Sequence, residues 1–300
     1  MSVTPSVYPL VPKIQKETIV SLLEVGKRAD GRGLEDIRKI SIVPDYIGKS
    51  DGSALVYLGD TLVLVGVKIE PGSPYPDTPD EGVLMINAEF VPLASPLFEP
   101  GPPDENAYEL ARIIDRSYRE IKAIELKDLV IIPGQKVLVL WNDIYVLNHS
   151  GNLIDASAMA TLVALMRTKI PNYEASEGGF IVKKEGYKGG LKVKKKVITA
   201  TVAKIGNYYI ADPTEEEEYV SDARLSVSFT EDGVIAGMQK MGPGSLEEKD
   251  IDAMVELSWK VAQRYLTEID SILKSFEQIS EGRRLEESGS SPQEKKGGLV

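Results

Sequence analysis

Three arginines on one predicted helix have the spacing of a phosphate-binding surface. Arg112, Arg116 and Arg119 lie at i, i+4 and i+7 in the segment NAYELARIIDRSYRE and therefore share one helix face. Each guanidinium can make paired N–H contacts to phosphate oxygens, which suits a phosphate backbone. An ordinary solvated face, with Asp115 and Glu120 pairing with Arg119 and Arg116, explains the same pattern. On spacing alone we favour the solvated face by about two to one.

Clustered carboxylates form a second candidate site. The segment DPTEEEEYVSD supplies Asp212, the run Glu215 to Glu218, and Asp222. Such a cluster can bind a divalent ion or hold a proton for general acid catalysis. A charge run of this kind is more often a solvated loop, so we expect a loop here and assign no metal ligand, and metal binding by Glu215 to Glu218 stays open.

The only histidine, His149, lies in a predicted strand–turn–helix unit, VLNHSGNLIDASAMA. The start of a helix after a short polar turn can bind an anion on free backbone N–H groups. A catalytic histidine would need an adjacent nucleophile, but neighbours on a strand, such as Ser150, point to opposite faces. Neither a nucleophile elbow nor a glycine-rich nucleotide loop is present. We therefore interpret His149 as structural.

Composition limits the remaining possibilities. The chain has 300 residues, a net charge of −11, one histidine and no cysteine, which excludes disulfides, thiolate catalysis and zinc sites built from cysteine or several histidines. No apolar stretch reaches the roughly 18 residues that span a bilayer, and prolines interrupt the N-terminus, so we expect a soluble, intracellular protein. The acidic balance argues against general nucleic-acid affinity and leaves only a local basic path. Seven lysines between residues 183 and 196 are typical of a protected edge strand.

The predicted elements indicate an α+β fold with mixed sheets packed against helices. Helices are expected over residues 12–27, 104–124, 153–169 and from about 245 to 276. Strands are expected over 38–46, 53–58 and 61–69, with a long strand or hairpin over 136–148 and four short strands after 196. The predicted organisation is an N-terminal helical segment (1–28), a first domain (29–175), a second domain (176–277) and a disordered tail (278–300).

Several ordered segments resemble the RNase PH family of phosphorolytic exoribonucleases. They are RADGRGLEDIRKISI, SDGSALVYLGDTLVLVGV, EFVPLASPLFEPGPPDENAYELARIIDRSYRE and VLNHSGNLIDASAMATLVAL, and the resemblance covers roughly residues 28–275. The FEPGPP segment followed by ELAR, DR and RE is similar to the non-catalytic RNase PH-type subunit of the archaeal exosome.

The resemblance implies a two-lobed RNase PH-type fold and a hetero-hexameric ring in which such a subunit alternates with a catalytic paralogue. Single-stranded RNA would thread through the ring, RNA-binding cap subunits would cover it, and the complex would be cytoplasmic. Inorganic phosphate, and Mg²⁺ where it is needed, would be used by the partner subunit, so no cofactor is expected here.

The same resemblance assigns roles to the candidate residues. Active relatives hold phosphate with a small residue, a hydroxyl and an arginine at the start of the helix, and these positions fall on Asn152, Leu153 and Ile154. Two aliphatic side chains cannot coordinate phosphate, so this phosphate site is degenerate and independent phosphorolysis is not expected.

The resemblance also assigns roles to two acids and to the arginine face. Asp212 and Glu218 match the spacing of the family's catalytic acids and are interpreted as remnants. In a ring, the arginine face would lie beside the partner's active site. The resemblance therefore reverses the preference for a solvated face that spacing alone gave. Arg112 and Arg116 are the main predicted RNA ligands, and Arg119 is included as a third.

Two alternatives stay open. One is a self-sufficient, phosphate-dependent 3′→5′ exoribonuclease that takes phosphate through an unconventional site using His149 or a lysine. The other is an RNA-associated binding module without a nuclease partner. Phosphate-dependent shortening of RNA by the isolated chain separates the first from a non-catalytic subunit, and failure to form a ring favours the second.

Overall fold

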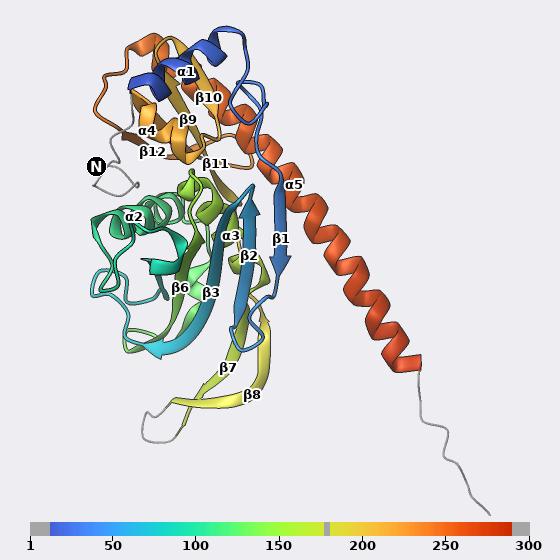
Figure 1. The fold of residues 1–300 in the computed structure, drawn as a ribbon. Coiled ribbons are helices and arrows are strands. Elements are labelled where there is room, and N and C mark those ends of the chain that lie inside the picture. Colours follow the sequence, from blue (N-terminus) through green and yellow to red (C-terminus); the bar gives the residue numbers. More distant parts are fainter. Residues whose placement is uncertain (1–12, 177–180, 290–300) are drawn as a thin grey trace, which may run out of the picture.

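The computed structural model describes residues 13–176 and 181–289, which form two larger sheets on either side of one helix and a third, two-stranded sheet (Figure 1). The first half contains α1 (Lys13–Glu24), β1 (Ile40–Pro44), β2 (Gly52–Leu58), β3 (Thr61–Gly72), β4 (Val83–Phe90), the 3₁₀ turn η1 (Pro92–Ala94), α2 (Glu105–Glu120), the 3₁₀ turn η2 (Leu126–Leu129), β5 (Val130–Ile132) and β6 (Lys136–Asn148). The second half contains α3 (Leu153–Arg167), β7 (Lys169–Ala175), β8 (Ile181–Gly190), β9 (Val197–Ile205), β10 (Tyr208–Ala211), α4 (Glu215–Val220), β11 (Ala223–Thr230), β12 (Ile235–Met241) and α5 (Glu248–Gly289).

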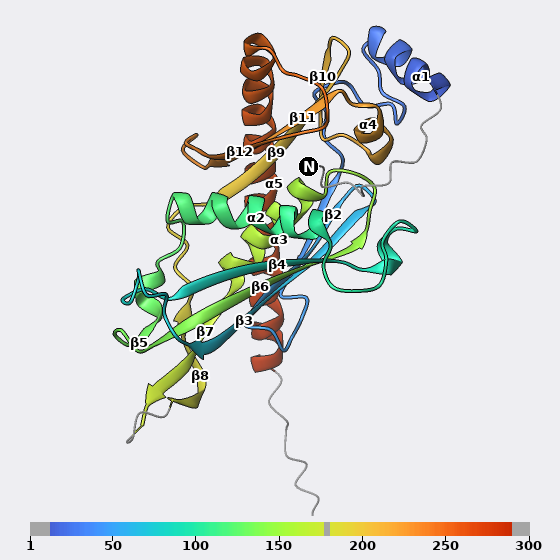
Figure 2. The same ribbon diagram turned by 90° about the vertical axis from the view of Figure 1, so that its left-hand side faces the viewer.

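The first lobe is a mixed sheet with the strand order β1-β2-β3-β6-β4, to which β5 adds by pairing with β6. Strand β4 runs parallel to β6, and the other pairs are antiparallel. Buried and partly exposed residues alternate along β3, as period-two side-chain geometry requires. Figure 2 shows α2 and α3 on the same side of this sheet, the side that carries the core.

The second lobe is an antiparallel sheet with the order β10-β9-β11-β12. Helix α5 packs on one face of β9 and β11, and α3 packs against β9. Helix α1 closes the β10 end through Ile19 and Leu23, which pack with Ile205, Ile210 and Val220. Every residue of β11 is buried, as expected for a central strand covered on both faces.

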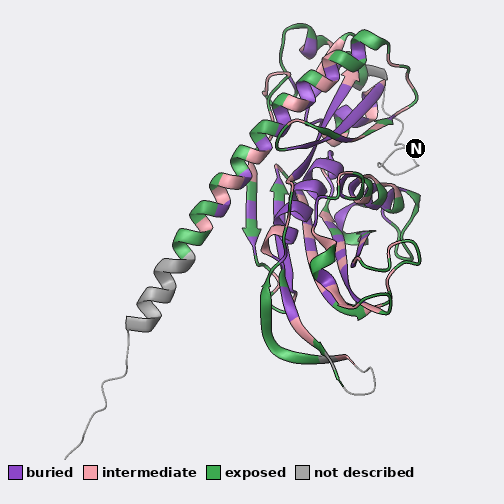
Figure 3. Cartoon of the chain, turned by 180° about the vertical axis from the view of Figure 1, so that it is seen from behind, coloured by how far each residue is buried: buried purple, intermediate pink, exposed green. Residues whose placement is uncertain are grey.

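Helix α3 lies between the lobes and positions the site. All residues from Leu153 to Leu165 are buried, and Figure 3 shows this helix in the colour of buried residues. Because both faces are covered, the helix carries no polar stripe, and alanines at positions 156, 158, 160 and 164 let the two sheets approach closely. One continuous core runs from the first sheet through α3 to α5.

The α+β architecture with mixed sheets is confirmed, but two predicted boundaries are wrong. The 175/176 domain boundary divides a hairpin, because β7 and β8 pair antiparallel and form a two-stranded extension. The second sheet begins only at Val197. Helix α5 continues to Gly289, so residues 278–289 are helical, because Glu, Arg, Leu and Gln in this segment favour helix and a single glycine does not end it. Residues 290–300 of the predicted tail, and 1–12 of the N-terminal segment, lie outside the described residues.

Other expectations agree with the described chain. The segment 136–148 is one long strand and not a hairpin. Lys183, Lys184 and Lys188 lie on β8, which has β7 as its only neighbour in the described sheets, so for them the edge-strand interpretation is confirmed. Lys192 to Lys196, whose alternation with apolar residues suggested the edge strand, follow β8 in an irregular segment in which only Val193 forms an isolated bridge. Among the described helices, none combines the length and apolar character needed to cross a bilayer.

Candidate functional site

The turn between β6 and α3 lies where the lobes meet, and its backbone conformation is tightly constrained. Gly151 and Asn152 have φ angles of 87° and 54°, both in the left-handed region. A Cβ atom on Gly151 would overlap the carbonyl carbon of Thr214 and the backbone nitrogen of Glu215. The turn is therefore pressed against the start of α4, and only glycine fits at position 151.

An internal carboxylate occupies the place where this turn could hold an anion. The backbone N–H of Asn152, the N-cap of α3, donates to Glu218 Oε1 at 3.0 Å. The Arg224 guanidinium lies 2.6 Å from the same oxygen, and both partners are almost fully buried. The helix N-terminus thus has its anion already, supplied by the protein itself.

No room is left for phosphate beside this carboxylate. Leu153 and Ile154 are each only 3% exposed, and with Asn152, Glu218 and Arg224 they line a cavity of about 10 Å³. A volume of this size holds one water molecule at most. A phosphate group would also lie against two aliphatic side chains that offer it no hydrogen bond.

Asp212 is ionised and fully engaged in ion pairs. It is completely buried, and Arg38 binds both carboxylate oxygens, at 2.9 Å from Nε and 2.7 Å from Nη2. Arg32 Nη1 and Asn152 Nδ2 donate to the same carboxylate at 3.1 and 2.8 Å. Burial alone would raise the pKa of Asp212, but hydrogen bonds and charge from Arg38, together with Asn152, hold this pKa below its usual value. The group therefore has no proton to give to a departing oxygen.

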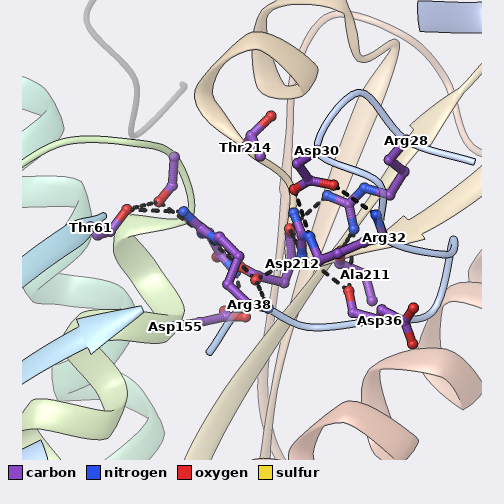
Figure 4. A network of polar contacts seen from close by, with 12 residues as sticks. Arg28, Asp30, Arg32, Asp36, Arg38, Thr61, Asp155, Ala211, Asp212 and Thr214 are labelled. Carbon is purple, nitrogen blue, oxygen red and sulfur yellow. Dashed lines mark hydrogen bonds and ion pairs between the residues drawn. The ribbon is translucent and has the colours of Figure 1, made fainter. Parts of the chain in front are cut away.

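Arginines of the segment 28–38 form hydrogen bonds and ion pairs with both lobes around Asp212 (Figure 4). Arg28 is 3% exposed, forms a two-oxygen ion pair with Glu217, and donates to the carbonyl oxygens of Ala211 and Asp212. Arg38 reaches the other way, donating to the carbonyl oxygen of Ser150 at 2.8 Å. Sequence reasoning did not single out these arginines. The available signal was the charged segment RADGRGLEDIR, which contains both Arg28 and Arg38.

The acidic run is not a solvated loop, so the prediction from its charge pattern is wrong. Residues 215–220 form α4, capped by Thr214, whose backbone N–H donates to Glu217 Oε2 at 2.8 Å. Glu217 and Glu218 are 2% and 7% exposed because each pairs with a buried arginine. In the described residues, no three Asp, Glu or His side chains are grouped to hold a metal ion.

A further buried carboxyl, Asp155, lies one turn into α3. Its oxygens accept hydrogen bonds from Asn152 Nδ2, Thr201 N, Thr201 Oγ1 and the Tyr265 hydroxyl at 2.6–3.1 Å. Burial is the dominant influence and raises the pKa of Asp155 to about 7, against the lowering effect of the hydrogen bonds from Thr201 and Asn152. Asp155 thus joins α3 to β9 and α5 and is a structural group.

His149 is a packed residue, as predicted. Its ring stacks on Phe98 with centroids 5.6 Å apart, and its Nδ1 accepts from the Gly151 N–H at 3.3 Å. Burial lowers the pKa of His149, so the ring is neutral at pH 7. The described neighbours include no nucleophile hydrogen-bonded to it.

Arg112 and Arg116 line a groove that crosses from one lobe to the other. The groove has a volume of about 540 Å³ and lies between α2 and the residues 226–239 of β11 and β12. Both arginines are exposed, and the described chain offers neither guanidinium a hydrogen bond or ion pair. Tyr108 and Met238, 60% and 46% exposed, add apolar surface beside them. Glu105, Glu109 and Glu120 line the groove as well, so only the part that carries the two guanidiniums, with Tyr108 and Met238 beside them, can bind phosphates and the faces of bases.

Arg119 is separated from this groove. It pairs with Asp115 at 2.8 Å and lines a different pocket, together with Tyr118 and Lys122. The predicted Asp115–Arg119 pair is thus confirmed. The predicted Glu120–Arg116 pair, in contrast, is not formed in this structure, which leaves Arg116 available to a ligand.

Both lobes match known family models. The 3′ exoribonuclease family, domain 1, matches residues 36–171, and domain 2 of the same family matches residues 196–261. The chain belongs to the RNase PH 3′ exoribonuclease family. The family boundaries agree with the structure in leaving most of the β7–β8 hairpin outside both domains.

The chain is also similar to named relatives and to chains of solved structures. The chain is 50% identical over 275 residues to the exosome complex component Rrp42 of Aeropyrum pernix, covering 91% of this chain and 100% of that protein. It is 48% identical to Rrp42 of Saccharolobus islandicus, covering 90% and 98%. A structure described as the Archaeoglobus fulgidus exosome with RNA bound to the active site contains a chain with 45% identity and a TM-score of 0.76, covering 85% and 97%. A chain of an archaeal exosome core has 40% identity and a TM-score of 0.74, covering 86% and 96%.

Proposed function

We propose that this chain is a non-catalytic structural and RNA-binding subunit of an exosome, a phosphorolytic 3′→5′ exoribonuclease ring. The observation that carries the proposal is the anion site of α3, which Glu218 fills and which leaves a cavity of about 10 Å³. A chain whose phosphate position is filled by its own carboxylate and lined by the aliphatic Leu153 and Ile154 needs a second subunit to supply the chemistry. The relatives named exosome components support this assignment.

The groove on α2 gives the chain its role in the ring. Arg112 and Arg116 present two guanidiniums without internal partners among the described residues, so they can neutralise RNA phosphates without first breaking an ion pair. The net charge of −11 makes general affinity for nucleic acid unfavourable, so RNA binding would depend on local contacts such as these two guanidiniums. RNA held here would reach an active site completed by a catalytic RNase PH-type paralogue.

The proposed assembly is an alternating hetero-hexamer with RNA-binding cap subunits, acting on single-stranded RNA in the cytoplasm. Inorganic phosphate, and Mg²⁺ where it is used, would bind the partner. Support comes from the exosome names of the relatives and from the RNA described in the active site of one similar structure.

The test is a shortening assay with 5′-labelled oligoadenylate and phosphate, using the chain alone, the catalytic paralogue alone and the mixture. We expect activity with the mixture and none with this chain alone. Arg112→Ala with Arg116→Ala is expected to weaken RNA binding by the ring about tenfold or more, because two charge-assisted contacts are lost.

A matched control removes two charges elsewhere. Lys260→Ala with Lys274→Ala changes net charge equally but lies on the exposed side of α5. It should leave RNA binding unchanged. Phosphate-dependent shortening by the chain alone would instead support the self-sufficient enzyme, and failure to assemble with any catalytic paralogue would support the binding module.

A further inference from the structure

The β7–β8 hairpin is a basic part of an acidic chain. Residues 169–196, which contain it, include eight lysines and three glutamates, whereas the whole chain has a net charge of −11. Figures 1 and 2 show the hairpin projecting from the end of the first lobe that lies away from the second lobe. The role proposed for the Arg112–Arg116 groove does not use this surface.

Packing does not explain the composition of the hairpin. All residues from Lys183 to Gly190 are exposed, and Figure 3 shows most of β8 in the colour of exposed residues. A two-stranded hairpin with uncovered faces buries little apolar surface. Its base is fixed to the lobe, because the Tyr173 hydroxyl donates to the carbonyl oxygen of Ile69 at 3.3 Å. The outer part therefore presents its side chains to solvent from a fixed base.

Four exposed lysines of this region have no ion pair among the described residues: Lys169, Lys183, Lys188 and Lys192. The described acids of the hairpin are Glu174 and Glu185, and Glu174 is already paired with Lys184 at 3.6 Å. Lys188 lines a cleft beside Asp128 and Glu174 but forms an ion pair with neither. Like charges gathered without partners repel each other, so an external anion would be attracted here.

An exposed aromatic ring lies among these lysines. Tyr187 is 54% exposed, and Lys169 Nζ lies 5.9 Å from the centroid of its ring. Lysines beside a ring that is free to stack are the combination by which proteins bind single-stranded nucleic acid without sequence preference. Protection of an open edge explains the lysines of β8 but not the ring, because an exposed aromatic side chain favours association at such an edge.

We propose that the β7–β8 hairpin is a second surface for single-stranded RNA. Lys183 and Lys188 would contact phosphates, and one base would stack on Tyr187. An acidic protein segment would neutralise the lysines without using the exposed ring. Two separate contacts on one strand would raise the affinity for RNA, since the second forms at high effective concentration. The inference rests on the proposed function only for the identity of the ligand as RNA.

The experiment measures fluorescence anisotropy of labelled oligoadenylate at several salt concentrations, with the purified full-length chain and with its complex with the catalytic paralogue. Lys183→Gln with Lys188→Gln should weaken binding about tenfold at low salt and lower the slope of log affinity against log salt by about 1.4, since each phosphate contact on a single strand contributes about 0.7. Tyr187→Leu should weaken binding about fivefold and leave the slope unchanged, because stacking is lost and no charge is removed.

Matched controls remove the same chemistry elsewhere. Lys49→Gln with Lys274→Gln removes two exposed lysines that have no ion pair in the described chain. Tyr46→Leu removes a tyrosine that is 55% exposed, close to the value of Tyr187. Neither control should change the affinity or the slope. The hairpin variants should also keep the thermal midpoint of unfolding, because the replaced side chains are exposed.

Three results would overturn the inference. Unchanged RNA binding with new self-association in size-exclusion chromatography would assign the lysines to edge protection alone. Unchanged RNA binding with loss of the complex with the catalytic paralogue would make the hairpin a contact between subunits. If Arg112→Ala with Arg116→Ala weakens RNA binding and the hairpin variants do not, only this inference fails; if neither preparation binds RNA, the proposed role of the groove fails with it.

Discussion

Asp155 should make the stability of this protein depend on pH in a direction opposite to that of most carboxylates. Its pKa is about 7 in the folded chain, against an ordinary value of 3.8. Between these values the native state binds a proton that the unfolded state releases, so the free energy of unfolding falls as pH rises. From pH 5 to pH 8 this group alone is expected to remove about 2.5 kcal/mol of stability.

Replacing Asp155 by asparagine isolates this contribution. The amide cannot ionise, but its NH₂ group would face at least one of the donors from Asn152, Thr201 and Tyr265. We expect Asp155→Asn to destabilise by about 1–3 kcal/mol at pH 5 because of this donor–donor conflict. The difference in free energy of unfolding between the parent and Asp155→Asn, which we call the deficit, should then shrink by about 2.5 kcal/mol at pH 8. At that pH the ionised Asp155 places a buried charge in the parent and destabilises it.

Guanidinium-induced unfolding, followed by far-ultraviolet circular dichroism at pH 5, 6, 7 and 8, measures this difference. Asp60→Asn is a suitable control, because Asp60 is exposed and the described chain provides its carboxylate no partner. A deficit for Asp155→Asn that is constant with pH, or that grows toward pH 8, would refute the assignment of a raised pKa to Asp155.

Two further predictions concern the buried acids and their arginines. Arg28→Leu should destabilise the chain by more than about 3 kcal/mol, because it leaves Glu217 buried and unpaired, and the double change to leucine at both positions should be milder in the same unfolding assay. Glu218→Ala should destabilise by about 3 kcal/mol or more by removing both the acceptor of the Asn152 N–H and the ion-pair partner of the buried Arg224, yet the shortening assay should detect no phosphorolysis by the isolated variant. Phosphorolysis by Glu218→Ala alone would mean that the carboxylate, and not Leu153 with its neighbour, is what blocks the site.

Most of the fold could be predicted from local patterns, and the failures have physical causes. Alternating or continuous apolar runs located β2, β3 and β6, and the amphipathic pattern located α2. The 175/176 boundary failed because glycine- and lysine-rich composition resembles a linker, whereas β8 forms its backbone bonds to β7 regardless of such side chains. Composition does not report long-range pairing.

Sequence reasoning selected the turn before α3 but not the residues that surround it in the structure. The resemblance places the family's phosphate-binding positions on Asn152, Leu153 and Ile154, and the aliphatic character of the last two is visible in the sequence. The carboxylate that fills the turn comes from residue 218, 66 positions from Asn152, and no sequence spacing relates the two. Charge pattern alone predicts a solvated acidic run because isolated charges avoid burial, but Arg28 and Arg224 compensate these acids across the fold.

Asp212 and Glu218 therefore have a structural explanation that needs no chemistry. The turn before α3 still presents a backbone N–H at a helix N-terminus, with the buried Arg224 beside it, and such a site is unfavourable without an anion. In a chain that does not bind phosphate there, Glu218 supplies that anion permanently. Asp212 does the same for Arg38. The presence of acids at catalytic spacing thus follows from the charge balance of the lobe junction and is not evidence of catalysis, whereas the two guanidiniums of the α2 groove have no such internal use in the described chain.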